Sequence, residues 1–346
     1  MNIMKSLKRR PATDQEMGLD DETLKRHRAL TADFTKLYRD LEVEGYFKPS
    51  PGHIAYRVVE LFLLMTAGIY LIQQDCGVCC TLGVMSFALF QGRCGWLQHE
   101  GGHHSLTGNS KVDRFIQAIF YGVGDGMASS WWSSQHNRHH AMPQRLKRDV
   151  DLETLPLLAF NSKVVRNPKH GKSFFVQNQA TLFLAIDTLL VATMWKLYLH
   201  PRYVIQRKRY HELFFMILHY AFAYSVGFFP YMTSVWLASI YIFGNFSLSH
   251  THLPVTQGPL HWVEYAFLHT LDIETSWWCD WWMAYLNYQI EHHLFPTMPQ
   301  FRHRLIRDRV RALAAKHNIP FYCSSYGDAV MKTYGNLLEV SKELRH

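Results

Sequence analysis

Histidines gathered in three short groups constrain this chain more than any other feature. The first group has two histidines four residues apart, and each of the others carries three side chains at offsets of zero, three and four. The groups are His99 and His103 in "HEGGHH", His136, His139 and His140 in "QHNRHH", and Gln289, His292 and His293 in "QIEHHL". On a helix these offsets bring the side chains within about 100° of one another, so that imidazoles can converge on one point.

These groups predict a metal centre rather than a polar helix face. The chain has 21 His in 346 residues, about three times ordinary usage. Imidazoles without thiolates suit Fe, Zn, Cu or Ni, and a single zinc needs about four ligands. Seven grouped histidines therefore favour two metals. We expect an eighth ligand from "NFSLSHTHLPV", in which a helix could aim only one of His250 and His252 inward; we favour His250, with His252 as the alternative.

Apolar runs predict an all-α integral membrane protein. Runs 54–72 and 76–97 are each long enough to cross about 30 Å of hydrocarbon and form a hairpin. The interrupted run 115–132 suits an interfacial or re-entrant element. Three more apolar runs follow, at 180–199, 212–229 and 231–249. If all three crossed the membrane, the third histidine group would lie on the other side of the membrane from the first two. The basic segment 201–210 prefers the cytosolic side, so we expect 180–199 to lie in the interface.

The predicted architecture therefore has four transmembrane helices and a cytosolic helical domain that carries the histidine site. Residues 1–50 form a polar cytosolic N-terminal segment without a cleavable signal, 51–330 form the membrane domain, and 331–346 form a C-terminal tail. The net charge of +8 beside long apolar runs fits an anionic membrane surface or a phosphate-bearing substrate better than nucleic acid.

The boxes HxxxH, HxxHH and QxxHH resemble those of the membrane fatty-acid desaturases. The third box, in "LNYQIEHHLFPTMP", is similar to that of the front-end branch, and the similarity extends from about residue 45 to about residue 330. The resemblance implies two non-haem irons and consumption of O2. It also implies insertion of a cis double bond between an existing double bond and the carboxyl end of a polyunsaturated acyl-CoA or acyl-lipid.

The resemblance also implies a ligand assignment. By similarity to related acyl-CoA desaturases, one iron would be held by His99, His103, His136 and His140. The other iron would be held by His139, His250, His292 and His293. Gln289 stands where most other desaturases have His, and it could bind through water or hydrogen-bond to its neighbours. Because His104 directly follows His103, either of them could be the last histidine of the first box. We expect no catalytic residue apart from the metal ligands.

Electron supply follows from the same resemblance. Many front-end desaturases carry an N-terminal cytochrome b5 domain with an HPGG motif, and the 53 residues before the first run contain no such motif. We therefore expect electrons from a separate cytochrome b5 and its NADH-dependent reductase, unless the gene model is incomplete. Basic segments 145–148 and 202–209 are the predicted contacts. The implied location is the endoplasmic reticulum, with the active site facing the cytosol.

Other functions share some of these features. A di-iron membrane lipid hydroxylase or a sphingolipid desaturase would carry the same boxes. A histidine-rich metal transporter would instead place its ligands inside crossing helices.

Two further sets of residues have alternative interpretations. Six tryptophans form either the wall of an acyl tunnel or an interfacial belt, namely Trp131, Trp132, Trp277, Trp278, Trp281 and Trp282. Five arginines in segment 302–311 either meet phosphates of CoA or lipid headgroups or form a solvated basic helix.

Overall fold

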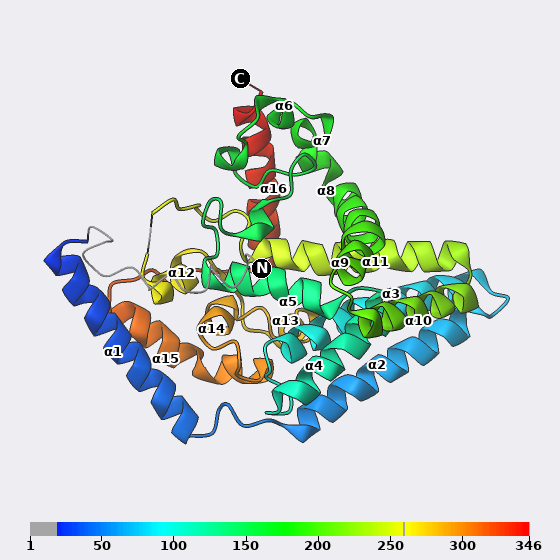
Figure 1. Cartoon of the computed structure of the whole chain (residues 1–346), viewed down its shortest axis with the longest axis horizontal. Helices are drawn as coiled ribbons and strands as arrows, with labels where there is room; N and C mark the ends of the chain where they lie inside the picture. Colours follow the sequence, from blue (N-terminus) through cyan, green and yellow to red (C-terminus); the bar gives the residue numbers. More distant parts are fainter. Residues whose placement is uncertain (1–18, 259, 346) are drawn as a thin grey trace.

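The computed structural model describes residues 19–258 and 260–345, so the part of the predicted N-terminal segment before residue 19 lies outside the described residues. The fold is helical, as the apolar runs predict (Figure 1). Strand pairing within the described residues is confined to two two-residue strands and one isolated bridge. These are the parallel pair β1 (Asp272–Ile273) and β2 (Cys323–Ser324), and the bridge between Arg145 and Thr256.

A long helical hairpin begins at Pro51. Helix α2 (Pro51–Ile72) starts with Ser50 as its cap and proline at its first position, and α3 (Gly77–Gly102) returns beside it. A Cβ atom on Gly83 would lie 2.7 Å from the backbone nitrogen of Ile72, so glycine permits this close approach. Helix α3 continues beyond the predicted apolar run and carries His99 in its last turn.

Among the described residues, three helices are long and apolar enough to cross a membrane: α2, α3 and the continuous helix Gln179–Gln206. The third combines α8 (Gln179–Thr188), the π-helical η5 (Leu189–Leu199) and α9 (His200–Gln206). The predicted crossings 212–229 and 231–249 form α10 (Tyr210–Val226) and α11 (Phe228–Leu248). Neither is among the three, because α10 has only 17 residues and α11 includes polar side chains such as Asn245 and Ser247. The predicted count of four crossings is therefore not confirmed.

The arrangement of these helices distinguishes two directions. In Figure 1, α2, α3, α10 and α11 extend toward the same side of the molecule, whereas α8 runs across them. Helix α11 contacts α3, α8 and α10. The outer faces of α2 and α10 leave large apolar side chains exposed, including Phe62, Phe214 and Tyr224. Exposed apolar surface of this extent is typical of contact with lipid or another protein.

Shorter helices form the region that completes the histidine site. Helix α4 (Ser110–Ile119) and the π-helical turn η2 (Phe120–Gly124) lead to α5 (Ser129–Ala141), in place of the predicted interfacial element 115–132. Short helices follow between residues 150 and 177: η3 (Val150–Leu152), η4 (Ser162–Val164), α6 (Pro168–Gly171) and α7 (Phe174–Gln177). Beyond α11 lie α12 (Trp262–Leu268), α13 (Trp277–Trp282), α14 (Gln289–Leu294), η6 (Gln300–Arg302), α15 (His303–Lys316) and α16 (Tyr326–Glu343).

Helix α1 (Asp21–Val43) packs against this region, where its Leu30, Phe34 and Leu41 share one apolar core with α12, α14 and α15. At the other end of the chain, α16 runs across residue 331 and packs on α8 and α11. Both segments are thus packed against the histidine-bearing part of the fold.

The arginines of segment 302–311 make contacts inside the protein. Arg302 donates to the carbonyls of Gly45 and Tyr46 at 2.6 and 2.8 Å. The others pair or stack within the chain: Arg304 with Asp280, Arg307 with Asp272, Arg309 with Glu44, and Arg311 over Phe321. These contacts tie α15 to α1, α13 and β1, a role that neither sequence interpretation anticipated.

Candidate metal centre

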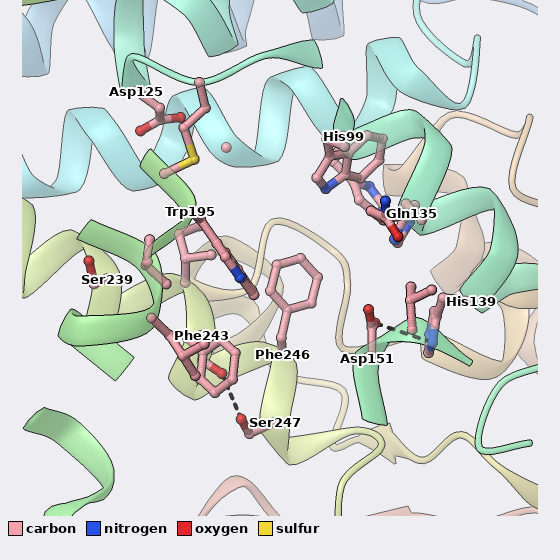
Figure 2. A pocket seen from close by; sticks show the side chains of 18 of the residues that line it. His99, Asp125, Gln135, His139, Asp151, Trp195, Ser239, Phe243, Phe246 and Ser247 are labelled. Carbon is pink, nitrogen blue, oxygen red and sulfur yellow. Dashed lines mark hydrogen bonds and ion pairs between the residues drawn. The ribbon is translucent and has the colours of Figure 1, made fainter. Parts of the chain in front are cut away.

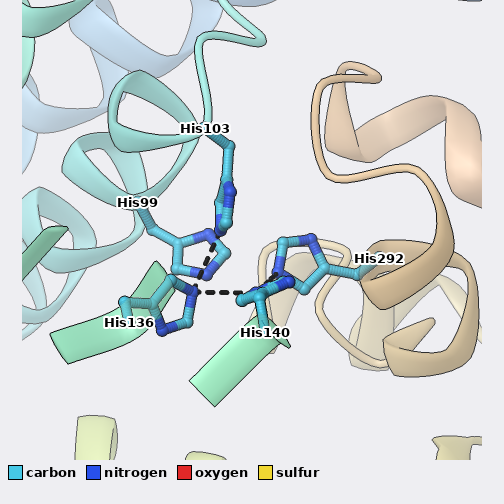
Figure 3. A group of neighbouring side chains, drawn as sticks. All are labelled: His99, His103, His136, His140 and His292. Carbon is cyan, nitrogen blue, oxygen red and sulfur yellow. Dashed lines mark hydrogen bonds between the residues drawn. The ribbon is translucent and has the colours of Figure 1, made fainter. Parts of the chain in front are cut away.

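Five imidazoles from three helices form the first histidine group (Figure 3). The end of α3 supplies two of them, α5 supplies two and α14 supplies one: His99, His103, His136, His140 and His292. Nε2 of His136 lies 3.0 Å from Nε2 of His103 and 3.0 Å from Nε2 of His140. Nε2 of His140 also lies 3.1 Å from Nε2 of His292.

Three more imidazoles, those of His139, His250 and His293, form the second group. Their ring centroids are 4.7 to 5.1 Å apart. The two groups adjoin, because the ring of His140 stacks on that of His293 with centroids 4.1 Å apart. The structure thus brings all eight predicted histidines together.

One residue lies in a different group from the one implied by the resemblance. His292 belongs with the first group, whereas we expected it beside His293 in the second. Adjacent residues on a helix point about 100° apart, so His292 and His293 can divide between the groups, and the packing of α14 decides which group each of them joins. The pair His139 and His140 on α5 divides between the groups in the same way.

The remaining candidates are placed as follows. His103 is the C-cap of α3, whereas His104 has a φ of 59° and belongs to neither group. His250, not His252, faces the second group. Gln289 is buried, lines the adjacent cavity, and has no hydrogen-bond partner for its Oε1 among the described residues.

The electrostatic environment keeps most of these imidazoles neutral. Burial lowers the pKa of His103 to about 3 and that of His250 to about 3. Burial, reinforced by neighbouring histidines, also holds the pKa of His140 and of His292 well below the ordinary value. A neutral imidazole has a lone pair available for a metal.

Three outer contacts orient the rings. Nδ1 of His139 lies 3.0 Å from Oδ2 of Asp149, and Nδ1 of His250 donates to the carbonyl of His269 at 3.1 Å. The buried amide of Gln300 lies against Nδ1 of His99, with 2.6 Å between the nitrogen atoms. Such partners fix ring orientation in metal sites. No motif in the sequence marks these three partners, because they come from segments outside the histidine groups.

His139 is the exception in charge. Burial would lower its pKa, but the carboxylates of Asp149 and Asp151 raise it to about 9. At neutral pH this imidazole therefore carries a proton on each nitrogen, with Nδ1–H facing Asp149. Binding of a metal with His250 and His293 would require loss of the proton from Nε2. This carboxylate–histidine arrangement is the one that metal-binding histidines usually show.

The donor set fits metal binding. Nitrogen atoms that share one ion at about 2.1 Å lie about 3.0–3.4 Å apart in octahedral or tetrahedral geometry. The Nε2 separations of 3.0 and 3.1 Å in the first group match this range. Two groups of buried and oriented imidazoles, all held neutral by burial except His139, can therefore hold metal ions side by side.

An adjoining cavity of about 480 Å³ begins at the histidines. Its walls come from α3, α5, η5 and α11, and Figure 2 shows Trp195, Phe243 and Phe246 between the histidine end and the end with Asp125 and Ser239. Asp151 faces the cavity beside His139. The volume is within the range of small-molecule sites, roughly 300–1,000 Å³.

The six tryptophans divide between the two interpretations. Trp131 and Trp132 line the cavity, as predicted for a tunnel wall. Trp277 is 81% exposed, and Trp278 and Trp281 are also exposed on the surface of α13. Trp282 is partly buried against an apolar cluster. Only the pair on α5 therefore contributes to the cavity.

Comparison with known proteins places these features in context. Residues 76–325 match the family described as Fatty acid desaturase. An acyl-lipid (8-3)-desaturase from Rebecca salina is 47% identical, with coverage of 90% of this chain and 75% of the relative. An acyl-lipid (8-3)-desaturase from Thraustochytrium sp is 44% identical, with coverage of 97% and 80%. An acyl-lipid (9-3)-desaturase from Borago officinalis is 28% identical, with coverage of 91% and 76%. The matched stretch contains both histidine groups.

Proposed function

The chain belongs to the fatty acid desaturase family and introduces a double bond into a fatty acyl chain, and we propose that it is a di-iron front-end enzyme acting on an acyl-lipid. The single observation that carries this proposal is the pair of imidazole groups at one end of a largely apolar cavity. The names of the two relatives above 40% identity support the acyl-lipid carrier and the (8-3) regiochemistry.

The proposed metal is iron, held by the two histidine groups. Iron supplies the oxidising power that removes two hydrogens from neighbouring methylenes when O2 is consumed. The reaction balances as one –CH2–CH2– unit, O2, two electrons and two protons giving one –CH=CH– unit and two waters. Both electrons must come from a donor protein.

The chain's own residues position the reactants. Asp149, Gln300 and the His269 carbonyl hold the imidazoles in place. Trp132 and Phe246 border the cavity beside His99, Trp131 lines it next to Trp195, and all three exclude water from the bound chain. A rigid wall of this kind holds one chosen pair of carbons at the reacting position.

The topology that we propose retains four crossings, by α2, α3, α10 and α11. His140 precedes the helix Gln179–Gln206 and His292 follows α11, yet their Nε2 atoms are 3.1 Å apart. The chain between them must therefore cross the membrane an even number of times. The hairpin of α10 and α11 provides two crossings, which leaves Gln179–Gln206 in the interface. The crosswise direction of α8 in Figure 1 supports this placement.

The proposed electron donor is cytochrome b5, reduced by its NADH-dependent reductase at the cytosolic face of the endoplasmic reticulum. Helix α5 separates the histidines from the surface, and a helix is only about 10–12 Å thick. Its outward face exposes Arg138, and the following loop exposes Lys147 and Arg148. An acidic donor would be attracted to this basic surface and would dock close to both histidine groups.

Expression in yeast tests the proposed function. Cells that carry the chain are fed polyunsaturated acids, and new double bonds are located by mass spectrometry in separated phospholipid and acyl-CoA pools. The expected product has its new bond on the carboxyl side of an existing one and appears first in phospholipid. Cells carrying the His293→Ala variant are the control and should form no product. A hydroxylated product, or early product in acyl-CoA, would contradict the proposal.

A further inference from the structure

A second cavity of about 550 Å³ adjoins the first. It lies between η5, α10 and α11, where the exposed side chains of Leu197, Tyr224 and Phe228 border it. Two residues, Lys196 and Val235, line both cavities. The wall between the cavity that begins at the histidines and this outer cavity thus contains these two side chains.

Lys196 is held firmly in this wall. The side chain is buried, and its Nζ lies 5.1 Å from the centre of the Tyr231 ring, a distance suited to a cation–π contact. The Tyr231 hydroxyl lies 2.7 Å from Nε2 of His219, whose Nδ1 donates to the carbonyl of Val123 at 2.9 Å. A chain of contacts from η2 through α10 and α11 therefore fixes the position of the ammonium group.

A second buried polar group, Asp125, lines the first cavity and interacts electrostatically with Lys196. In Figure 2, Asp125 lies at the end of the cavity away from His139 and Asp151. Ionisable side chains therefore occur at both ends of the cavity: Asp151 beside His139 at one end, and Asp125, which interacts with Lys196, at the other. An apolar chain gains nothing by displacing the buried amino group of Lys196 from its partners.

We propose that Lys196 is the stop against which the methyl end of the acyl chain abuts, so that it sets the greatest chain length accepted. The inference rests on the proposed function, because it assumes that an acyl chain enters from the histidine end. Shortening Lys196 joins the two cavities and gives the methyl end a route into the outer one. Lys196 is thus a specificity-determining residue.

The test uses yeast cells that express the full chain and receive an equal mixture of polyunsaturated acids differing by two carbons in length. The measured quantity is the amount of product from the acid two carbons longer, divided by the amount of product from the preferred acid. In Lys196→Ala this ratio should rise roughly ten-fold, the gain expected from two more buried methylenes. Val235→Ala thins the same wall and should raise the ratio in the same direction. Lys196→Met retains the length of the side chain and should keep the native ratio.

Met194→Ala is the matched control, because Met194 lines the first cavity but not the shared wall. Its ratio should stay within about two-fold of the native one, since opening space elsewhere adds far fewer buried methylenes. The lengths of acyl chains that co-purify with each variant provide a second readout, which needs no activity. Native ratios and native co-purified lengths in both Lys196→Ala and Val235→Ala would overturn the proposal. A wild-type chain that forms no double bond contradicts the proposed function instead, and the co-purified lengths still decide this inference.

Discussion

Asp149 anchors the imidazole of His139, with 3.0 Å between Oδ2 and Nδ1 and both side chains buried. The carboxylate is itself fixed, because it accepts hydrogen bonds from the backbone nitrogens of Gln144 and Asp151. His139 is therefore oriented by a group that cannot turn away. This relationship leads directly to the first prediction.

Asp149→Ala should weaken metal binding by the second histidine group. Loss of such an outer partner typically lowers metal affinity 10–100-fold, so iron content measured after dialysis against a chelator should fall toward half. Asp308→Asn, an exposed change on α15, is the control and should retain its iron. Full iron occupancy in Asp149→Ala would show that His139 does not depend on this carboxylate.

The two histidines at the end of α11 should behave differently. His250→Ala removes an imidazole of the second group and should lower iron content and abolish desaturation. His252→Ala changes a side chain outside both groups and should preserve both properties. Iron analysis of the two purified variants, with product analysis in cells, makes the comparison. Equal losses in both variants would be evidence against the assignment of His250.

Cysteine labelling should reveal the membrane topology. Cys76 is exposed at the turn between α2 and α3, and Cys323 is exposed in β2. Four crossings put Cys323 on the side of the histidines and Cys76 on the other. In single-cysteine variants, an impermeant maleimide added to sealed microsomes should label Cys323 at once, but Cys76 only after detergent. Labelling of both without detergent would contradict the proposed topology.

Charge reversal beside α5 should slow electron delivery. The double variant Lys147→Glu, Arg148→Glu makes the surface above the histidines repel an acidic donor, so its turnover should saturate only at higher cytochrome b5 concentration. Added salt should slow the wild type more than the variant, because screening weakens the attraction. The measurement is NADH-driven desaturation in reconstituted membranes. Lys342→Glu on α16 is the matched control, and the surface assignment fails if both variants respond alike.

Packing between α3 and α11 should tolerate no side chain at Gly92. A Cβ atom there would overlap the ring of Tyr241, whose hydroxyl accepts a hydrogen bond from Trp96 Nε1 at 2.8 Å. Gly92→Ala should cost about 1–3 kcal/mol of stability, as overpacking does. Thermal unfolding in detergent measures it. Gly244→Ala, with open space around it, should not lower the unfolding temperature. Equal unfolding temperatures for wild type and Gly92→Ala would show that the interface can adjust.

Local patterns predicted much of this molecule. The histidine offsets correctly indicated helices that present imidazoles on one face, and the resemblance to front-end desaturases is confirmed. The runs 54–72 and 76–97 correspond to α2 and α3. These features depend on residues within one or two helical turns, which a sequence displays directly.

The remainder depends on contacts between distant segments. Gln300 reaches His99 across 201 residues, and no periodic pattern marks it. The grouping of His292 depends on how α14 is rotated relative to α3, which helical spacing alone leaves undetermined. Run 180–199 is as apolar as a crossing helix, so its composition does not distinguish a crossing from an interfacial position. The arguments for the interface are the histidines on both sides of it and the crosswise direction of α8.

The division of each neighbouring histidine pair between the two groups has a consequence for how this enzyme can vary. His139 and His140 are joined by a single peptide bond and belong to different groups, so the backbone of α5 fixes the distance between the two groups. Deleting one residue between His136 and His139 would rotate both rings by about 100° relative to His136. A single deletion would then remove one imidazole from each of the two histidine groups. Insertions and deletions in the protein should therefore be confined to loops beyond these helices.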